Sequence, residues 1–375
     1  MRPETETELA GMIAGAEGPL VVRGGGTRPV GGPVTGEVLD MSGMSGVVLH
    51  EPGALTLVVK AGTPVTEVEK VLAAEGQRLP FEPMDHRALL GTAGEPTMGG
   101  LVAGNVSGPR RVQVGACRDF LLGVRFVDGR GRVLKNGGRV MKNVTGYDLV
   151  KLMAGSWGTL GVMTELAFKV LAVPQAEATL VRRGKSARDG VAALAAALGS
   201  PFDVSGAAHV EGRTQVRVEG LAGSVAYRAE QLQKGPLAGF DVVQGGESAA
   251  LWREVRDVTP FAGVEGAVWR VSVKPSDGPA LTEGLTARGV AHRAILDWGG
   301  GLVWLLVDGR TDGGAADIRG LLETMGGHAT LIRGGEALRR SVPVFQPEAV
   351  PVAAISQGLR AKFDPRGILN PGLMG

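Results

Sequence analysis

Three glycine-dense turns carry the residue types that bind a phosphate-bearing ligand. They are Arg23–Arg28 (Arg-Gly-Gly-Gly-Thr-Arg), Thr97–Gly108 and Gly155–Val162. Glycine lets a backbone approach a ligand with no Cβ in the way. Consecutive N–H groups in such turns converge on an anion, and the arginines at both ends of the first turn add positive charge. We therefore predict that one large phosphate-bearing cofactor lies across the three turns.

The first turn does not match the common nucleotide-binding loops. A Walker loop needs Gly-Lys-Ser/Thr, and a Rossmann site needs GxGxxG at the start of a helix. Taken alone, Arg23–Arg28 fits a tight structural turn equally well, because glycine supplies 61 of the 375 residues. The prediction of a cofactor site therefore depends on all three turns together.

Composition excludes several other functions. Basic and acidic residues number 40 and 38 and are interspersed, so no nucleic-acid-binding surface is expected. Cys117 is the only cysteine, which excludes an internal disulfide and thiolate-rich zinc or iron–sulfur sites, and we expect it to be buried. The five histidines are scattered, so no metal site is predicted. No apolar run approaches the roughly 20 residues of a membrane span. A cytoplasmic location is expected, with membrane association only through partners.

The elements that position the turns are mixed. Strands are expected at Leu20–Arg23 and Leu55–Gly62, followed by a helix with Thr63 as N-cap and a stop at Gly76. Phe120–Val127 and Arg132–Leu134 are typical of a hairpin.

The following region contains a repeated β-α-β-β-α-β order, the split βαβ pattern. One linking helix, Ser248–Asp257, separates the two copies. Two such units predict one antiparallel sheet of about eight strands with helices on one face. The first copy comprises Glu177–Arg183, Ala187–Leu198, Val204–Glu211, Thr214–Glu219, Gly223–Lys234 and Val242-Val243. The second comprises Ala267–Lys274, Pro279–Arg288, His292–Trp298, Leu302–Asp308, Ala315–Met325 and His328–Arg333. An amphipathic helix, Val350–Phe363, follows them.

Taken together, the motifs resemble the FAD-binding superfamily of vanillyl-alcohol oxidase and p-cresol methylhydroxylase. The family's G-G-G-T loop, T-x-G-G turn, x-G-x-x-x-D stretch and G-T-L-G-V strand entry occur here in that order, with D-P-x-G-x-L-N-P-G at Asp364–Gly372. The residues within and around these motifs are most similar to those of the FAD-binding E subunits of bacterial glycolate oxidases. The supporting stretches are 107–112, 115–120, 140–148 and 297–304. The resemblance implies an α+β fold: a two-lobed FAD-binding domain of p-cresol-methylhydroxylase type (residues 1–175, completed by 335–375) and an inserted antiparallel-sheet cap of duplicated ferredoxin-like type (176–334).

The same resemblance assigns cofactor-binding residues. It places Arg23, Gly24, Gly25, Gly26, Thr27 and Arg28 on the pyrophosphate, and Thr97, Gly99, Gly100, Gly104, Asn105 and Ser107 along the pyrophosphate and flavin edge. Gly161 and Val162 would contact the adenine side, Asn370 would close over the cofactor, and Pro83 and Met84 would line the pocket. Some relatives attach flavin to a histidine after the glycine loop; the sequence here continues Gly26-Thr27-Arg28, so FAD is expected to be non-covalent.

The catalytic residues are less evident. Hydride transfer from a 2-hydroxy acid needs a base and a cation for the carboxylate, and His328 and Arg333 are the candidates. In a regular strand they lie on opposite faces, so only a bulge would bring them to one site. A solvated or structural role remains open for both residues. Trp298 and Trp304 are interpreted as sheet core. The histidine-rich metal motif and the late G-E-H-G element of related 2-hydroxy-acid dehydrogenases are absent.

The resemblance implies an FAD-dependent oxidoreductase acting on a CH–OH group, within a complex that oxidises glycolate to glyoxylate. Its partners would be a larger flavin subunit and an iron–sulfur subunit, because a single cysteine cannot ligate a cluster. Two alternatives stay open: a non-catalytic flavin-bearing accessory subunit, and a stand-alone FAD oxidoreductase for another 2-hydroxy acid.

Overall fold

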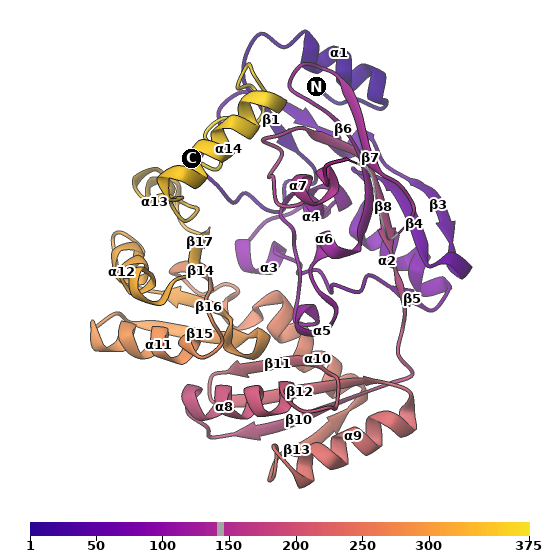
Figure 1. Ribbon diagram of the computed structural model, residues 1–375. Helices are drawn as coiled ribbons and strands as arrows, with labels where there is room; N and C mark the ends of the chain where they lie inside the picture. Colours follow the sequence, from indigo (N-terminus) through magenta and orange to yellow (C-terminus); the bar gives the residue numbers. More distant parts are fainter. Residues whose placement is uncertain (141–145) are drawn as a thin grey trace.

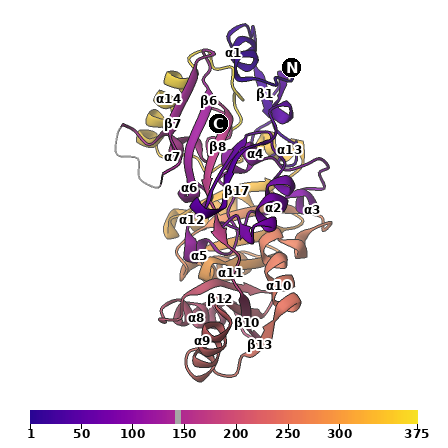
Figure 2. The same ribbon diagram turned by 90° about the vertical axis from the view of Figure 1, so that its right-hand side faces the viewer.

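The computed structural model describes residues 1–140 and 146–375, so the middle of the 140–148 stretch lies outside it. Two antiparallel sheets form the framework: a five-stranded sheet ordered β3-β4-β8-β6-β7 and an eight-stranded sheet ordered β13-β10-β12-β11-β15-β16-β14-β17. The views in Figures 1 and 2 agree that the two sheets lie in separate parts of the molecule, one above the other.

The part built mainly from the first 170 residues carries the glycine turns. The predicted hairpin is confirmed as β6 and β7, but the helix after Thr63 is capped by Pro64, because the Thr63 hydroxyl donates to the Lys60 carbonyl at 2.7 Å. The main elements here are α1 (Glu6–Ala14), β1 (Leu20–Arg23), β2 (Glu37–Asp40), β3 (Val47–Glu51), β4 (Thr56–Lys60), α2 (Val65–Ala74), α3 (Arg87–Leu90), α4 (Met98–Ala103), α5 (Arg111–Val114), α6 (Cys117–Phe120), β6 (Leu121–Val127), β7 (Val133–Gly137), α7 (Leu149–Met153) and β8 (Val162–Lys169).

The eight-stranded sheet confirms the repeated order. Its two halves meet where β11 pairs antiparallel with β15, His209 opposite Leu296. The first half contains β10 (Ala176–Arg183), α8 (Ala187–Leu198), β11 (Val204–Val210), β12 (Arg213–Gly220), α9 (Ala222–Lys234) and β13 (Asp241–Gln244), and α10 (Gly245–Asp257) links it to the second. The second half contains β14 (Ala267–Ser272), α11 (Asp277–Ala287), β15 (His292–Asp297), β16 (Leu302–Val307), α12 (Ala315–Met325) and β17 (His328–Arg333).

The expectation of helices on one face concerned the two repeated units, and the helix that links them lies on the other face. Helix α8 packs on the face that carries His209 and Thr214, where a Cβ at Gly190 would come within 2.3 Å of the His209 ring. Helix α10 lies on the opposite face, because its Trp252 donates to Thr179 Oγ1 at 2.8 Å. That second face carries polar groups that need partners, and α10 supplies them.

The chain returns to the first part after β17 through α13 (Glu336–Ser341) and α14 (Val350–Phe363), the helix predicted with these bounds (Figure 1). Beyond it, Leu20 of β1 forms a parallel bridge with Leu369, and the Leu20 N–H donates to the Ile368 carbonyl at 2.7 Å. None of the described helices combines the length and apolarity that a bilayer crossing requires.

Candidate functional site

The first glycine turn opens onto a cavity of about 370 Å³, the glycine-lined cavity. Its walls include the whole turn Arg23–Arg28, Thr97 and Gly100 of the second turn, Trp157 of the third, and Asn370. A smaller adjoining pocket adds Gly99, Gly161 and Val162. Residues from all three turns and from the C-terminal segment therefore meet in one place.

The backbone of the first turn presents free donors. Among the described residues, the N–H groups of Gly24, Gly25, Gly26, Thr27 and Arg28 have no hydrogen-bond acceptor. Backbone N–H groups are normally paired with protein or solvent, and a run of five along a cavity is suited to a bound anion. The site thus fits the pyrophosphate of a dinucleotide cofactor.

Two glycines in this turn are required by packing within the protein. A Cβ at Gly25 would lie 1.7 Å from the Glu95 carbonyl oxygen, and one at Gly24 would lie 2.2 Å from Thr97 Oγ1. The missing side chains let the first turn pack directly against the start of the second. The reason is therefore different from the ligand approach expected from the sequence.

Asn370 joins two of the turns. Its Oδ1 accepts from the Val22 N–H at 2.8 Å, and its Nδ2 donates to the Trp157 carbonyl at 2.9 Å. The side chain is 5 % exposed. It therefore fastens the C-terminal segment across the strand that leads into the first turn.

The second turn is held by its own side chains. Thr97 Oγ1 accepts from Gly100 N–H at 3.3 Å, Asn105 Oδ1 accepts from Arg118 N–H at 3.1 Å, and Ser107 Oγ accepts from Cys117 N–H at 2.9 Å. Cys117 itself is buried, as expected.

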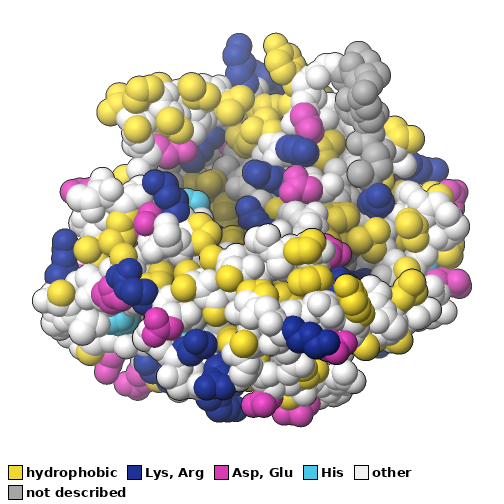
Figure 3. Space-filling view, turned by 60° about the horizontal axis from the view of Figure 1, so that its bottom comes forward, with side chains coloured by type: hydrophobic (Ala, Val, Ile, Leu, Met, Phe, Trp, Pro, Cys, Tyr) yellow, Lys and Arg dark blue, Asp and Glu magenta, His cyan; other side chains and the backbone are white. Residues whose placement is uncertain are grey.

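A second cavity of about 470 Å³, the arginine-lined cavity, lies between this turn and the face of β14 and β17. Gly104, Asn105, Ser107 and Met84 line it, whereas Pro83 lines neither cavity. The charged or titratable side chains in its wall are Arg28, Arg111, Arg118, Arg270, His86 and His328, and no described carboxylate joins them. Figure 3 shows a hollow on the molecular surface with Lys or Arg side chains inside it. A cavity of this composition attracts an anion.

Two of the arginines lie against one tryptophan. The guanidinium carbon of Arg111 is 4.4 Å from the Trp298 ring centroid, and that of Arg270 is 5.2 Å. Burial, with the neighbouring charge of Arg111, lowers the pKa of Arg270 to about 10, so it stays a cation at neutral pH. Neither guanidinium has a hydrogen-bond or ion-pair partner within the described part of the chain. Both are therefore available to a carboxylate.

His328 faces these arginines, and Arg333 does not. Burial, followed by the charges of Arg270 and Arg111, lowers the pKa of His328, which makes it a neutral base at pH 7. A register shift places Arg333 opposite Val268 of β14, so the bulge does occur. The guanidinium of Arg333, however, donates to the carbonyls of Phe261 (2.9 Å) and Leu89 (3.0 Å), away from the cavity lining. Arg270 occupies the place that the sequence suggested for Arg333.

The two cavities meet at Arg28 and Trp157, which line both. Arg28 Nη1 donates to the Gly100 carbonyl at 2.7 Å, and its Nε contacts His86 Nδ1 at 3.3 Å. The two cavities therefore share part of their walls.

Sequence reasoning missed Arg111, Arg118, Arg270, His86 and Trp157, and it assigned Trp298 to the sheet core. One signal was present. Arg270 is a charged residue inside the apolar strand Ala267–Ser272, and a charge in such a position is rarely buried without a purpose. Trp304 does lie in the sheet, at 5 % exposure, although it also lines the cavity.

Comparison with known proteins shows the family of the chain. Residues 1–137 match the FAD binding domain family. The chain is 36% identical over 360 residues to the glycolate oxidase subunit GlcE of Escherichia coli K12, covering 95% of this chain and 92% of the relative. The chain belongs to the GlcE family. FAD is its cofactor, and its fold class is the predicted one.

Two other relatives match less than half of this chain. Glycolate oxidase subunit GlcD of Bacillus subtilis 168 is 31% identical over 44% of this chain and 34% of its own length, and D-lactate dehydrogenase of Anaerostipes hadrus is 29% identical over 47% and 36%. Among solved structures, alkyldihydroxyacetonephosphate synthase superposes with a TM-score of 0.69 at 17% identity, covering 99% of this chain and 75% of that one, which shows a shared fold.

Within the described ranges, no group of three or more His, Cys, Asp or Glu residues could hold a metal ion.

Proposed function

We propose that this chain is the FAD-binding subunit of a glycolate-oxidising complex, and that a small 2-hydroxy acid binds in its arginine-lined cavity. The observation that carries the proposal is the junction at Arg28 and Trp157. There the cavity lined by the first glycine turn meets the cavity in which Arg111 and Arg270 have no hydrogen-bond or ion-pair partner among the described residues. Non-covalent FAD would occupy the first cavity, held by Arg23–Arg28, Thr97, Gly99, Gly100 and Asn370, and it would supply a hydride acceptor. Gly104, Asn105, Ser107, Met84, Gly161 and Val162 would line its flavin and adenine ends, with Pro83 in the turn behind them.

Residues of the arginine-lined cavity would bind the substrate and accept its hydroxyl proton. Arg111 and Arg270 would bind the substrate carboxylate, and together with Trp298 they fix its orientation. Neutral His328 would take the proton of the hydroxyl group as hydride leaves the adjacent carbon.

The complex would also contain a larger flavin subunit and an iron–sulfur subunit. Two relatives support this: E. coli GlcE and B. subtilis GlcD are each named as a glycolate oxidase subunit. We assign residues 1–175 and 335–375 to the FAD-binding domain and 176–334 to the cap, in a cytoplasmic protein that reaches a membrane only through these partners.

The test is the visible spectrum of the purified, FAD-reconstituted chain before and after anaerobic addition of glycolate. Bleaching of the bound flavin is the expected result. A flavin that stays oxidised on this chain, while the full complex turns over, would move substrate oxidation to a partner. The chain would then be the accessory flavin subunit, the second candidate, which the missing histidine-rich motif favours.

A further inference from the structure

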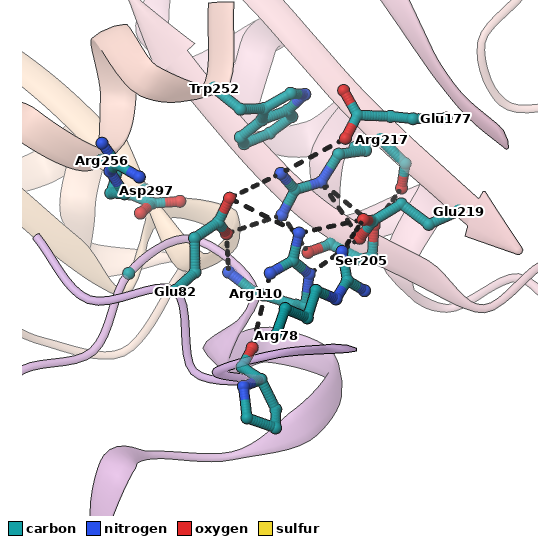
Figure 4. Close-up of polar contacts among 12 residues, drawn as sticks. Arg78, Glu82, Arg110, Glu177, Ser205, Arg217, Glu219, Trp252, Arg256 and Asp297 are labelled. Atoms are coloured by element: carbon teal, nitrogen blue, oxygen red, sulfur yellow. Dashed lines mark hydrogen bonds and ion pairs between the residues drawn. The ribbon is translucent and has the colours of Figure 1, made fainter. Parts of the chain in front are cut away.

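A buried cluster of ion pairs joins the two parts of the molecule beside the arginine-lined cavity (Figure 4). Arg217 of β12 forms two bonds of 2.9 Å with the carboxylate of Glu82, which precedes the Pro83–Met84 turn. A second pair has the charges exchanged between the two parts: Arg110 of the first part forms two bonds of 2.9 Å with Glu219 of β12. The four residues Glu82, Arg110, Arg217 and Glu219 are called the interdomain cluster below.

The cluster is charge-balanced, and Arg110, Arg217 and Glu219 are buried. Arg78 adds a bond of 2.7 Å to Glu219, and Glu177 lies 3.9 Å from Arg217, giving three guanidiniums and three carboxylates. Arg217 is 1 % exposed and stacks on Trp252 at 4.5 Å. Burial opposes the charge of Glu82, but Arg217 and Arg110 outweigh it and lower the pKa of this carboxyl group. Such a cluster contributes little net stability compared with apolar packing, but it strictly defines geometry.

The same backbone segments carry the cluster and the cavity wall. Arg110 is followed directly by Arg111, which lies on Trp298. Trp298 in turn donates from Nε1 to the Gly108 carbonyl at 3.1 Å. A Cβ at Gly108 would lie 2.1 Å from the Glu82 carbonyl oxygen, so the two segments from the first part are in direct contact.

Arg111 and Arg270 reach Trp298 from different parts of the molecule. Arg111 belongs to the first part, whereas Arg270 and Trp298 belong to the eight-stranded sheet region. The spacing between Arg111 and Arg270 therefore depends on the position of the eight-stranded sheet relative to the first part. The interdomain cluster joins the two parts by ion pairs and includes Arg110, the residue directly before Arg111.

We propose that Glu82, Arg110, Arg217 and Glu219 are positioning residues that set the spacing between Arg111 and Arg270, and through it the affinity for the substrate carboxylate. This inference rests on the proposed function of the arginine-lined cavity. A shift of the sheet would separate the two cations without removing either.

The test uses Arg217→Lys and Glu82→Gln in the FAD-loaded chain. Lysine keeps the charge of Arg217 but loses its planar fork, and glutamine keeps the shape of Glu82 but loses its charge. Oxalate, a small carboxylate that cannot lose a hydride, is titrated while the flavin spectrum is recorded, and FAD content and Tm are measured in parallel. Both variants should bind oxalate about tenfold more weakly, or ~1.4 kcal/mol, with stoichiometric FAD. In the complex, the KM for glycolate should rise and kcat should change little.

The matched control is Arg213→Lys on the same strand, whose 2.7 Å pair with Glu254 stays within the sheet region. It should leave oxalate binding unchanged. Arg270→Met separates the two proposals. If Arg270→Met also leaves oxalate binding unchanged, the proposed function of the cavity is wrong. If Arg270→Met weakens binding while Arg217→Lys and Glu82→Gln lower only the Tm, the cluster is structural and the positioning role is overturned.

Discussion

The Nδ1 atom of His86 accepts a hydrogen bond from Nε of Arg28 across 3.3 Å, so the imidazole must be neutral in the native protein. Burial, and then the positive charge of Arg28, hold the pKa of His86 well below its usual value near 6.5. The pair lies at the boundary between the two cavities, where Arg28 also bonds the Gly100 carbonyl. Protonation of His86 would place two cations against each other in a buried setting.

Stability should therefore fall as the pH decreases below about 6.5. In that range the unfolded chain binds a proton at residue 86 that the native protein excludes, and the loss amounts to ~1.4 kcal/mol per pH unit at most. Urea unfolding of the wild type and of His86→Gln at pH 7.5 and 5.5 measures this. The glutamine variant should lose less stability on acidification, and equal losses in the two proteins would contradict the prediction.

Substitution of Arg270 should affect ligand binding, whereas substitution of Arg333 should affect stability. Arg270→Met removes an unpaired cation from the cavity and should weaken oxalate or glycolate binding ~10- to 100-fold, the range of a charge-assisted hydrogen bond. Arg333→Met should leave binding unchanged but lower the Tm, because the Phe261 and Leu89 carbonyls lose their donor. Titration and thermal melting of both variants give the comparison. Weakened binding in Arg333→Met alone would return the carboxylate role to that residue.

The pyrophosphate site is best tested at Arg23. A substitution at Gly25 would clash with the Glu95 carbonyl whatever the cofactor does, so loss of FAD there would be ambiguous. Arg23 has an exposed side chain at the rim of the glycine-lined cavity. Arg23→Glu should weaken FAD binding about tenfold through repulsion of the phosphates, and Arg23→Gln less, as measured by fluorescence titration of the apoprotein. Equal affinities in all three proteins would place the phosphates elsewhere.

Asp297 should make the stability fall as the pH rises, opposite to the effect of His86. Burial, only partly offset by the Trp298 N–H that it accepts at 2.7 Å, raises the pKa of its carboxyl group to about 7. Between about pH 4 and 7 the native protein holds a proton that the unfolded chain has lost, so this group costs stability as the pH rises, by ~1.4 kcal/mol per unit. Asp297→Asn keeps the acceptor oxygen and removes the titration. Unfolding at pH 5 and 7 should show the variant gaining on the wild type by ~2 kcal/mol between these values, and a constant difference would refute the assignment.

The sequence predicted the elements well where local patterns decide them. The repeated order of β10–β17 and the bounds of α14 follow from periodicity and from glycine or proline at the ends. The convergence of Arg23–Arg28, Thr97 and Asn370 was predicted only through the joint resemblance of the motifs. No local pattern brings residue 370 beside residue 22.

The substrate side could not be predicted, because it is made by packing between distant segments. Arg111 is unremarkable in its short helix and gains its role only when Trp298, nearly 190 residues later, lies against it. Arg333 shows the converse. Its side chain has a chemical type suited to a carboxylate, but in the fold the guanidinium donates hydrogen bonds to loop carbonyls. The face on which α10 packs could not be predicted for a related reason, since the partners of Thr179 and Arg217 lie outside their own strands.

The bridge between Leu20 and Leu369, with the bonds of Asn370, has a consequence for biosynthesis. A nascent chain cannot complete the wall of the glycine-lined cavity until residues 369–373 have left the ribosome, long after the first turn has been made. The entire eight-stranded sheet emerges in between. The wall of the glycine-lined cavity is therefore completed only after the whole eight-stranded sheet has been synthesised.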